Sequence, residues 1–286
     1  MAPSKLEDCL RVTKVTPEYW RATFNDPPMN LLTPEMTLAL WQLADDLEAD
    51  EDVRVIVFDS NAPDYFIMHF DMIRGSEALK EPGKGWPLFI QRLVQMPVIS
   101  IASIRGRARG VGSEFILSCD MRFASIEKAI IGQPEVGAGV IPGGSALEWL
   151  PSLVGRSRAL EICAGSEDFD GKTAELYGYV NRAVPDDKLD EFVDAYARRI
   201  AGFNKFPLAQ VKMIINNRAS TPSISDIQHS QSVFTECTHR PDTQQRIKNL
   251  FAAGLQQDGP FERNLGKELA YIDSKDSGSK GITVSI

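Results

Sequence analysis

Cysteine and histidine are scarce in this sequence, and neither occurs in a pattern typical of a metal site. The four cysteines among 286 residues are far apart and include no CxxC pair: Cys9, Cys119, Cys163 and Cys237. Disulfide-dependent secreted folds and zinc modules use closely and regularly spaced cysteines. Their absence argues against both classes and favours a reducing compartment. We therefore expect a cytoplasmic location, with an organelle matrix as the alternative. His229 and His239 have no carboxylate or cysteine at ligand spacing, so we predict no metal.

Long hydrophobic runs are also missing. The longest apolar stretch, around Pro97 to Ile104, is far shorter than the roughly 20 residues that cross a bilayer. The first fifteen residues contain no apolar segment of the signal-peptide type. We expect no membrane span and no cleaved signal.

Basic residues are outnumbered, since 31 lysines and arginines stand against 39 acidic residues and give a net charge of -8. Because nucleic-acid affinity depends mainly on neutralised phosphates, this balance argues against a nucleic-acid partner. A small phosphorylated ligand stays compatible, because a local basic pocket can oppose the global charge. A chain of this length buries roughly three quarters of the surface that its unfolded form exposes, so it can be stable without disulfide bonds.

The first third of the chain predicts a strand, a helix and a strand. Residues 20–25 and 53–59 are strand candidates, and the second is almost continuously apolar, as buried strands are. Between them, Thr33 and Pro34 are typical of the N-cap and first position of a helix. The residues that follow place apolar side chains on one helical face: Met36, Leu40, Leu43 and Leu47.

The middle of the chain predicts a parallel sheet, and the rest predicts helices. A strand at 98–104, a glycine-rich turn at 106–112, a helix at 113–119 and a strand at 121–124 follow one another. From about Pro151 onward we expect only helices. The candidates are 187–200, 207–217, 225–237 and 243–256. We expect a core over 1–200 that holds the site, a helical region over 201–275 and a flexible tail over 276–286.

The glycine-rich turn is the first segment that could carry chemistry. Gly110-Val111-Gly112 lies between a strand and a helix, where glycines permit close backbone approach and the first helical N–H groups lack partners. Such donors, at the positive end of a helix dipole, suit an oxyanion, and Glu114 lies in the first turn. The alternative is a tight structural turn in which Glu114 only complements the dipole.

The second segment is 131–145, where Glu135 stands between a proline and a run of small residues. If this carboxyl is buried, its pKa rises toward the range useful for proton transfer at neutral pH. The alternative is a solvent-facing loop glutamate.

Taken together and in this order, these segments resemble the enoyl-CoA hydratase/isomerase family, also called the crotonase superfamily. The resemblance covers roughly residues 10–255. It is carried by five stretches: FNDPPMNLLTPEM with Asn30, GRARGVGSEFILSCDMRFAS, IGQPEVGAGVIPGG, LVGRSRALEICAGS and AELYGYVNRAVP.

The resemblance implies an α/β fold, a crotonase-like spiral of ββα turns with a C-terminal helical trimerisation region. It implies a homotrimer or a dimer of trimers and an acyl-CoA substrate, with no cofactor because coenzyme A is part of the substrate. Two backbone N–H groups grip the thioester oxygen in the family. The matching positions are Val111, where glycine is usual, and Met68.

One departure from the family's pattern lies at Met68, His69 and Phe70, which are bulky where the family is small and glycine-rich. Asp71 retains the family's acid. This departure predicts a reshaped pocket and a specialised acyl group. His69 has two interpretations, a third acid/base near the thioester or a hydrogen-bonded structural histidine. The substrate-binding residues that we predict are His69, Phe70, Asp71, Gly110, Pro142 and Gly143.

The family's hydratases use two glutamates, and Glu114 and Glu135 match them. Their pairing favours the addition or removal of water, with an enolate held by the two N–H groups. One alternative is a double-bond isomerase that uses Glu135 alone. Another is a non-catalytic crotonase-fold binding or scaffold protein.

Near the C-terminus, Phe261, Glu262, Arg263 and Lys267 allow two interpretations. The segment either closes over coenzyme A from a neighbouring subunit or covers its own domain.

Overall fold

The computed structural model describes residues 8–74, 85–219 and 221–274, so the expected tail at 276–286 lies outside the described residues. At the centre lies a six-stranded sheet in the order β1-β2-β3-β4-β6-β9. Its strands are β1 (Leu10–Thr16), β2 (Tyr19–Phe24), β3 (Val55–Ser60), β4 (Ile99–Ile104), β6 (Met121–Ser125) and β9 (Arg182–Val184). All neighbours pair in parallel except β1 and β2, which are antiparallel. The predicted, largely parallel sheet is therefore confirmed, whereas β1 was not predicted.

A smaller sheet alternates with the large one along the chain. It consists of β5 (Arg107–Arg109), β7 (Ile130–Gly132) and β8 (Asp168–Asp170). The chain passes from β4 to β5, from β6 to β7 and from β8 to β9, so each turn adds one strand to each sheet. The prediction of a simple turn over 106–112 was wrong, because β5 lies inside it. The prediction of helices alone after Pro151 was also wrong, because β8 and β9 are strands of three residues without a readable pattern.

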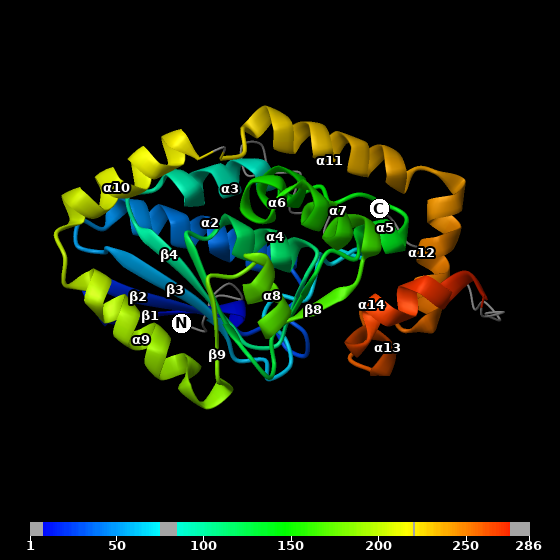
Figure 1. Cartoon of the computed structure of the whole chain (residues 1–286), viewed down its shortest axis with the longest axis horizontal. Coiled ribbons are helices and arrows are strands. Elements are labelled where there is room, and N and C mark those ends of the chain that lie inside the picture. The colour runs from blue at the N-terminus through cyan, green and yellow to red at the C-terminus, as the bar shows by residue number, and fades with distance from the viewer. Residues whose placement is uncertain (1–7, 75–84, 220, 275–286) are drawn as a thin grey trace.

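Helices cover both faces of the large sheet, which explains why β3 is apolar at successive positions (Figure 1). Val55 and Val57 pack against α9 (Asp186–Ala201). Ile56 and Phe58 face the opposite layer, which consists of α2 (Pro34–Ala49), α3 (Trp86–Gln95) and α4 (Val111–Ser118). Thr33 caps α2 as predicted, because its Oγ1 accepts a hydrogen bond from the N–H of Met36 at 3.2 Å.

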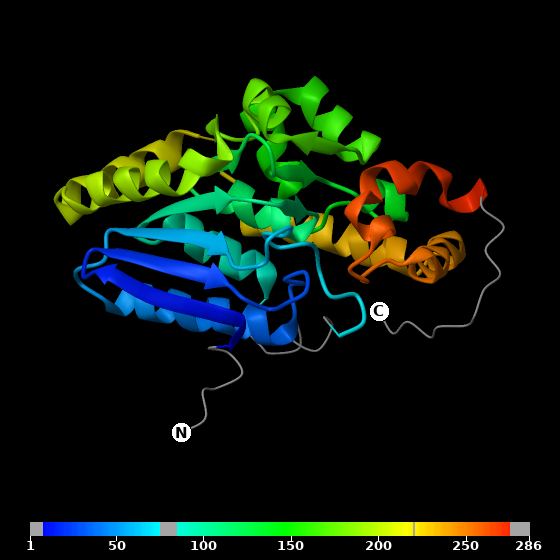
Figure 2. The ribbon, with the colours of Figure 1, turned by 90° about the horizontal axis from the view of Figure 1, so that it is seen from below.

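The remaining helices lie between the later strands or follow the last strand. Between the strands lie α5 (Glu135–Ala138), α6 (Ala146–Val154), α7 (Arg156–Gly165) and α8 (Gly171–Tyr177). After α9 come α10 (Lys205–Arg218), α11 (Ile224–Thr238), α12 (Pro241–Ala253), α13 (Pro260–Arg263), α14 (Leu265–Glu268) and a final 3-10 turn, η2 (Leu269–Ser274). The bounds of α9 to α12 agree with the predicted helices. Figures 1 and 2 show α12, α13 and α14 gathered at one end of the molecule, where α12 and η2 contact α5.

Within the described ranges, none of the helices combines the length and the apolar character that crossing a membrane requires. No disulfide joins the four cysteines in the described part of the chain, and three of them are buried.

Candidate active site

Helix α4 begins in close contact with the loop that follows β3. A Cβ atom at Gly112 would lie 1.9 Å from the carbonyl oxygen of Ile67, so only glycine fits there. Gly110, the N-cap, has a φ of 53°, in the left-handed region that favours glycine. Among the described residues no acceptor is found for the N–H of Val111, the first residue of the helix. The glycines therefore bring an unpaired N–H group close to this loop.

Three backbone hydrogen bonds join the loop over residues 66–71 to the segment around Asn30. The N–H of Met68 donates to the carbonyl of Asn30 at 3.2 Å. The N–H of Leu32 donates to the carbonyl of His69 at 2.9 Å, and the N–H of Asp71 donates to the carbonyl of Leu32 at 3.2 Å. Asn30 itself is fully buried. The loop is also bonded to β5, through Phe66 at 2.8 Å and Met68 at 3.0 Å, so the segment around Asn30 and β5 together fix its conformation.

This pairing argues against the predicted role of Met68 as an oxyanion donor, because its N–H is already bonded to the carbonyl of Asn30. The N–H of Phe70 has no acceptor among the residues that the structure describes. The carbonyl of His69 and the N–H of Phe70 belong to one trans peptide unit, in which the two groups point in opposite directions. Because the carbonyl of His69 points toward Leu32, the N–H of Phe70 points away from it. Phe70 and Val111 line the same cavity. Their two N–H groups could both donate to a ligand atom in this cavity.

Glu114 is buried in this cavity, with 3% of its surface exposed. Its Oε1 accepts hydrogen bonds from the N–H groups of Gly144 at 2.7 Å and Ala146 at 3.3 Å. Burial raises the pKa of Glu114 to about 7, although these two hydrogen bonds partly oppose the rise. A group with this pKa can both accept and release a proton at neutral pH.

Glu135 opens α5 on another wall of the cavity. Its Oε2 is buried and has no hydrogen-bond partner among the described residues. Its Oε1 lies close to Gly110, where a Cβ atom would be 2.7 Å away. Burial, followed by the nearby charge of Glu114, raises the pKa of Glu135 well above its ordinary value. Both carboxyl groups are therefore held toward their neutral forms, and the charge of Glu114 opposes the ionisation of Glu135.

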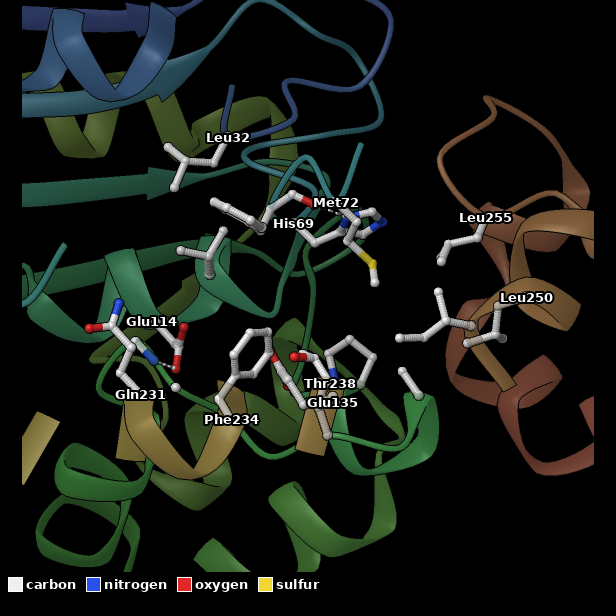
Figure 3. Close-up of a pocket in the computed structure, with 18 of the residues that line it drawn as sticks. Leu32, His69, Met72, Glu114, Glu135, Gln231, Phe234, Thr238, Leu250 and Leu255 are labelled. Carbon is white, nitrogen blue, oxygen red and sulfur yellow. Dashed lines mark hydrogen bonds between the residues drawn. The ribbon is translucent and has the colours of Figure 1, made fainter. Parts of the chain in front are cut away.

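The cavity has a volume of about 170 Å³ and mainly apolar walls. Figure 3 shows Glu114 and Glu135 directed into it, with the ring of Phe234 from α11 between them in this view. Helices α12 and α14 of the same chain supply more of the wall: Ile247, Leu250 and Leu265. The C-terminal helices therefore form part of the cavity wall.

The predicted binding residues divide into two groups. His69, Phe70 and Gly143 line the cavity, whereas Asp71, Gly110 and Pro142 do not. Asp71 instead caps a turn, since its Oδ1 accepts hydrogen bonds from the N–H groups of Ile73 and Arg74, both at 3.0 Å.

Sequence reasoning missed Trp86 and Phe234. Trp86 Nε1 donates to the carbonyl of Gly144 at 3.0 Å and so supports the segment that binds Glu114. The ring of Phe234 lies against Gly143, where a Cβ atom would be 2.9 Å from Phe234 Cβ. Neither residue belongs to a local motif, because both reach the cavity from separate helices.

Both ring nitrogens of His69 are engaged with the protein. Nε2 lies 3.0 Å from Glu262 Oε1, and Nδ1 lies 3.1 Å from the carbonyl oxygen of Phe70. Neither nitrogen is free for a substrate, which favours the structural interpretation of His69. Glu262 is fully buried against its own domain. Of the two interpretations of the C-terminal segment, Glu262 supports the one in which it covers its own domain.

Comparison with known proteins agrees with this geometry. The sequence profile of the family described as Enoyl-CoA hydratase/isomerase matches residues 20–266. A Bacillus subtilis protein described as a "probable enoyl-CoA hydratase" is 30% identical over 204 residues, covering 68% of this chain and 78% of that protein. The alpha subunit of the fatty acid oxidation complex of Aliivibrio fischeri is 33% identical over 177 residues, which cover 59% of this chain and 26% of the subunit.

Solved structures of enoyl-CoA hydratases are also similar to this chain. A protein from Streptomyces avermitilis, described as a "putative enoyl-CoA hydratase", superposes with a TM-score of 0.88 at 42% identity, over 92% of this chain and 97% of that one. An enoyl-CoA hydratase from Mycobacterium avium subsp. paratuberculosis has a TM-score of 0.74 at 23% identity, over 82% of this chain and 92% of its own. The second likeness concerns the fold alone. The predicted crotonase-like α/β fold is confirmed.

Proposed function

Because this chain belongs to the enoyl-CoA hydratase/isomerase family, we propose that it adds water to an α,β-unsaturated acyl-CoA or removes it from a β-hydroxyacyl-CoA. One observation carries the proposal. Two buried carboxyl groups with raised pKa values, Glu114 and Glu135, line the same apolar cavity as Phe70 and Val111, whose N–H groups lack acceptors among the described residues. Two buried carboxyl groups in different surroundings suit one base and one acid in a single reaction.

In the hydration direction, the Glu114 carboxylate takes a proton from water while the water oxygen bonds to the β carbon. The electrons of the double bond move toward the thioester and form an enolate, whose oxygen accepts hydrogen bonds from the N–H groups of Phe70 and Val111. Neutral Glu135 then delivers its proton to the α carbon. Transfer of a proton from Glu114 to Glu135 restores the starting state. The role of Glu114 as base rests on its two hydrogen bonds from Gly144 and Ala146, which stabilise the ionised form.

The size and polarity of the cavity bear on the acyl group. A dry cavity of about 150 Å³ holds a benzene ring. At about 170 Å³, with few polar atoms in its wall, this cavity suits a short, branched or aromatic acyl group. We propose that coenzyme A, as part of the substrate, is the only coenzyme that the reaction involves. We also retain the proposal of a cytoplasmic location.

Absorbance of the conjugated enoyl thioester tests the proposal directly. Short, branched and aromatic enoyl-CoAs are incubated with the wild type and with the Glu114→Gln and Glu135→Gln variants. We expect the wild type to consume the conjugated thioester, and we expect each variant to lose about 10²- to 10⁴-fold in rate. Full turnover by Glu114→Gln would instead support the isomerase that uses Glu135 alone. Failure of acyl-CoA to bind at millimolar concentration would support the scaffold protein.

The surface of α10 supports the homotrimer or dimer of trimers. Its polar side chain Lys212 points inward and lies 2.8 Å from Asp120 Oδ2. Its outward face is apolar, with exposed fractions of 74% for Phe206, 56% for Val211 and 58% for Ile215. A helix that buries a lysine and exposes several large apolar side chains is typical of a contact between chains. We propose that α10 lies in the subunit interface.

A further inference from the structure

The geometry around His69 favours a proton on each ring nitrogen. Nε2 faces a carboxylate oxygen of Glu262 at 3.0 Å, and Nδ1 faces the carbonyl oxygen of Phe70 at 3.1 Å. Both of these partners are acceptors, and a neutral imidazole has only one N–H group. The amide Nε2 of Gln256 lies farther from Nδ1, at 3.4 Å, and donates to the carbonyl of Phe70 at 2.8 Å. We propose that Glu262 holds His69 as an imidazolium, and that this buried ion pair is a positioning device for the Phe70 N–H donor.

His69 acts on Phe70 through the peptide units on either side of it. The carbonyl of Phe70 accepts hydrogen bonds from His69 Nδ1 and from Gln256 Nε2, the latter at 2.8 Å. The carbonyl of His69, in the peptide unit that contains the Phe70 N–H, accepts from Leu32 at 2.9 Å. Both peptide units are therefore held at their carbonyl oxygens, and hydrogen bonds along such a chain polarise one another. The Phe70 N–H is fixed in direction before a substrate arrives.

The C-terminal segment of the same chain supplies these contacts. Glu262 Oε2 accepts a hydrogen bond from the N–H of Gln256 at 2.6 Å. This bond holds Gln256 at a φ of 62°, a conformation that residues other than glycine rarely adopt. One carboxylate therefore binds His69 with one oxygen and orients Gln256 with the other. Glu262 thus controls both side chains that bind the Phe70 carbonyl.

An arginine ties this segment to the strand before α4. Arg109 of β5 is almost completely buried and donates to the carbonyl of Glu262 at 2.6 Å. The same guanidinium pairs with both oxygens of Asp168, each at 2.7 Å. Because β5 leads directly into Gly110, the segment around Glu262 is connected to both oxyanion donors. The site is therefore ordered only when the C-terminal segment packs in this position.

Several charged groups surround His69 and determine its titration. Glu262 on α13 favours the imidazolium, and Arg109 on β5 opposes it. Asp71 lies on the same loop, and Glu135 and Glu114 are acidic groups in the wall of the cavity that His69 also lines. Burial lowers the pKa of His69, but Glu262 and the hydrogen bonds raise it by more, so it lies above the ordinary 6.5. The stability that this pair contributes is present below pH 6.5 and is lost as the pH rises through the folded pKa.

Nitrogen NMR of histidine-labelled protein tests the protonation state independently of the reaction. The chain has three histidines, and both others, His229 and His239, are exposed. Single His229→Gln and His239→Gln variants assign the signals. We expect His69 to carry protons on both nitrogens at neutral pH in the wild type and to lose one in Glu262→Gln. A neutral His69 ring in the wild type would overturn the proposal.

The positioning role rests on the proposed hydratase function and is tested by kinetics. We expect Glu262→Gln to lower kcat by about 10- to 100-fold with a smaller change in KM, because a donor displaced by about 1 Å costs that much. The alkaline limb of the kcat profile should move to lower pH. Glu175→Gln, which removes an exposed carboxylate on α8, is the matched control and should keep the wild-type profile.

The outcomes distinguish failure of the positioning role from failure of the proposed hydratase function. If Glu262→Gln lowers the melting temperature but leaves kcat and the pH profile unchanged, the pair is only structural and the positioning role is refuted. If the wild type hydrates no enoyl-CoA, the proposed function fails, whereas the NMR result still decides the state of His69.

Discussion

Replacing Glu114 by glutamine should remove activity and yet stabilise the fold at alkaline pH. The carboxyl is buried, and its pKa is raised from 4.5 to about 7. The folded chain therefore retains a proton that the unfolded chain releases above pH 4.5. Stability falls as the pH rises between these values, because the unfolded state binds fewer protons. Glutamine does not ionise, so the variant does not lose this stability as the pH rises.

The size of the effect follows from the two pKa values. One pKa unit corresponds to about 1.4 kcal/mol, so a rise from 4.5 to about 7 corresponds to about 3 kcal/mol. We expect the stability of Glu114→Gln, measured relative to the wild type, to be about 2.5 kcal/mol greater at pH 8 than at pH 5, because part of the full change already lies below pH 5. Taking the difference between the two pH values cancels the pH-independent cost of placing an amide beside Gly144 and Ala146.

Urea denaturation at pH 5 and pH 8, at one fixed protein concentration, measures this difference. Glu175→Gln, which removes an exposed carboxylate, should show almost no dependence on pH relative to the wild type. If Glu114→Gln gains no more stability at pH 8 than at pH 5, then Glu114 is not an acid destabilised by burial, and its assignment as a base near neutral pH loses its support.

Three further changes test the packing of the site and the assembly. Gly112→Ala should cost at least about 100-fold in rate and lower the melting temperature, because the added Cβ would lie 1.9 Å from the carbonyl oxygen of Ile67 and push α4 away from the oxyanion loop; wild-type kinetics would refute this contact. Arg109→Met should destabilise the fold by about 3–5 kcal/mol in urea titrations, because it leaves Asp168 and the carbonyl of Glu262 without their partner; an unchanged midpoint would show that the network is dispensable. Ile215→Asp on α10 should shift the mass measured by analytical ultracentrifugation toward that of one chain, and an unchanged assembly would place the interface elsewhere.

Local signals predicted much of the fold. The apolar run of β3 predicted a strand covered on both faces, and Thr33 with Pro34 predicted the start of α2. Strands without such signals were missed. β5 has only three residues inside a glycine-rich turn, and β1 is an edge strand that exposes most of its side chains. Their pairing depends on the neighbouring strands and not on their own sequence.

Candidate site residues that lie within a local sequence motif were predicted. Those that reach the site from distant segments of the chain were missed. Glu114 and Glu135 were predicted from their own stretches, and both line the cavity. The sequence pointed to Met68, and not to Phe70, as the oxyanion donor. The proposal of Phe70 depends on the hydrogen bonds that Asn30 and Leu32 make with this loop, which only the fold reveals. Glu262, 193 residues from its partner, was connected to His69 only by the fold.

The central claim is that the enzyme adds water across the double bond of an enoyl thioester through Glu114 and Glu135. Mass spectrometry of the product formed in heavy-oxygen water tests it most directly. We predict that the wild type yields a β-hydroxyacyl-CoA heavier than the substrate by one water molecule, with the heavy oxygen on the β carbon, and that Glu114→Gln and Glu135→Gln yield almost none. A product of unchanged mass with a shifted double bond, or labelled product formed at the wild-type rate by either variant, would contradict the account.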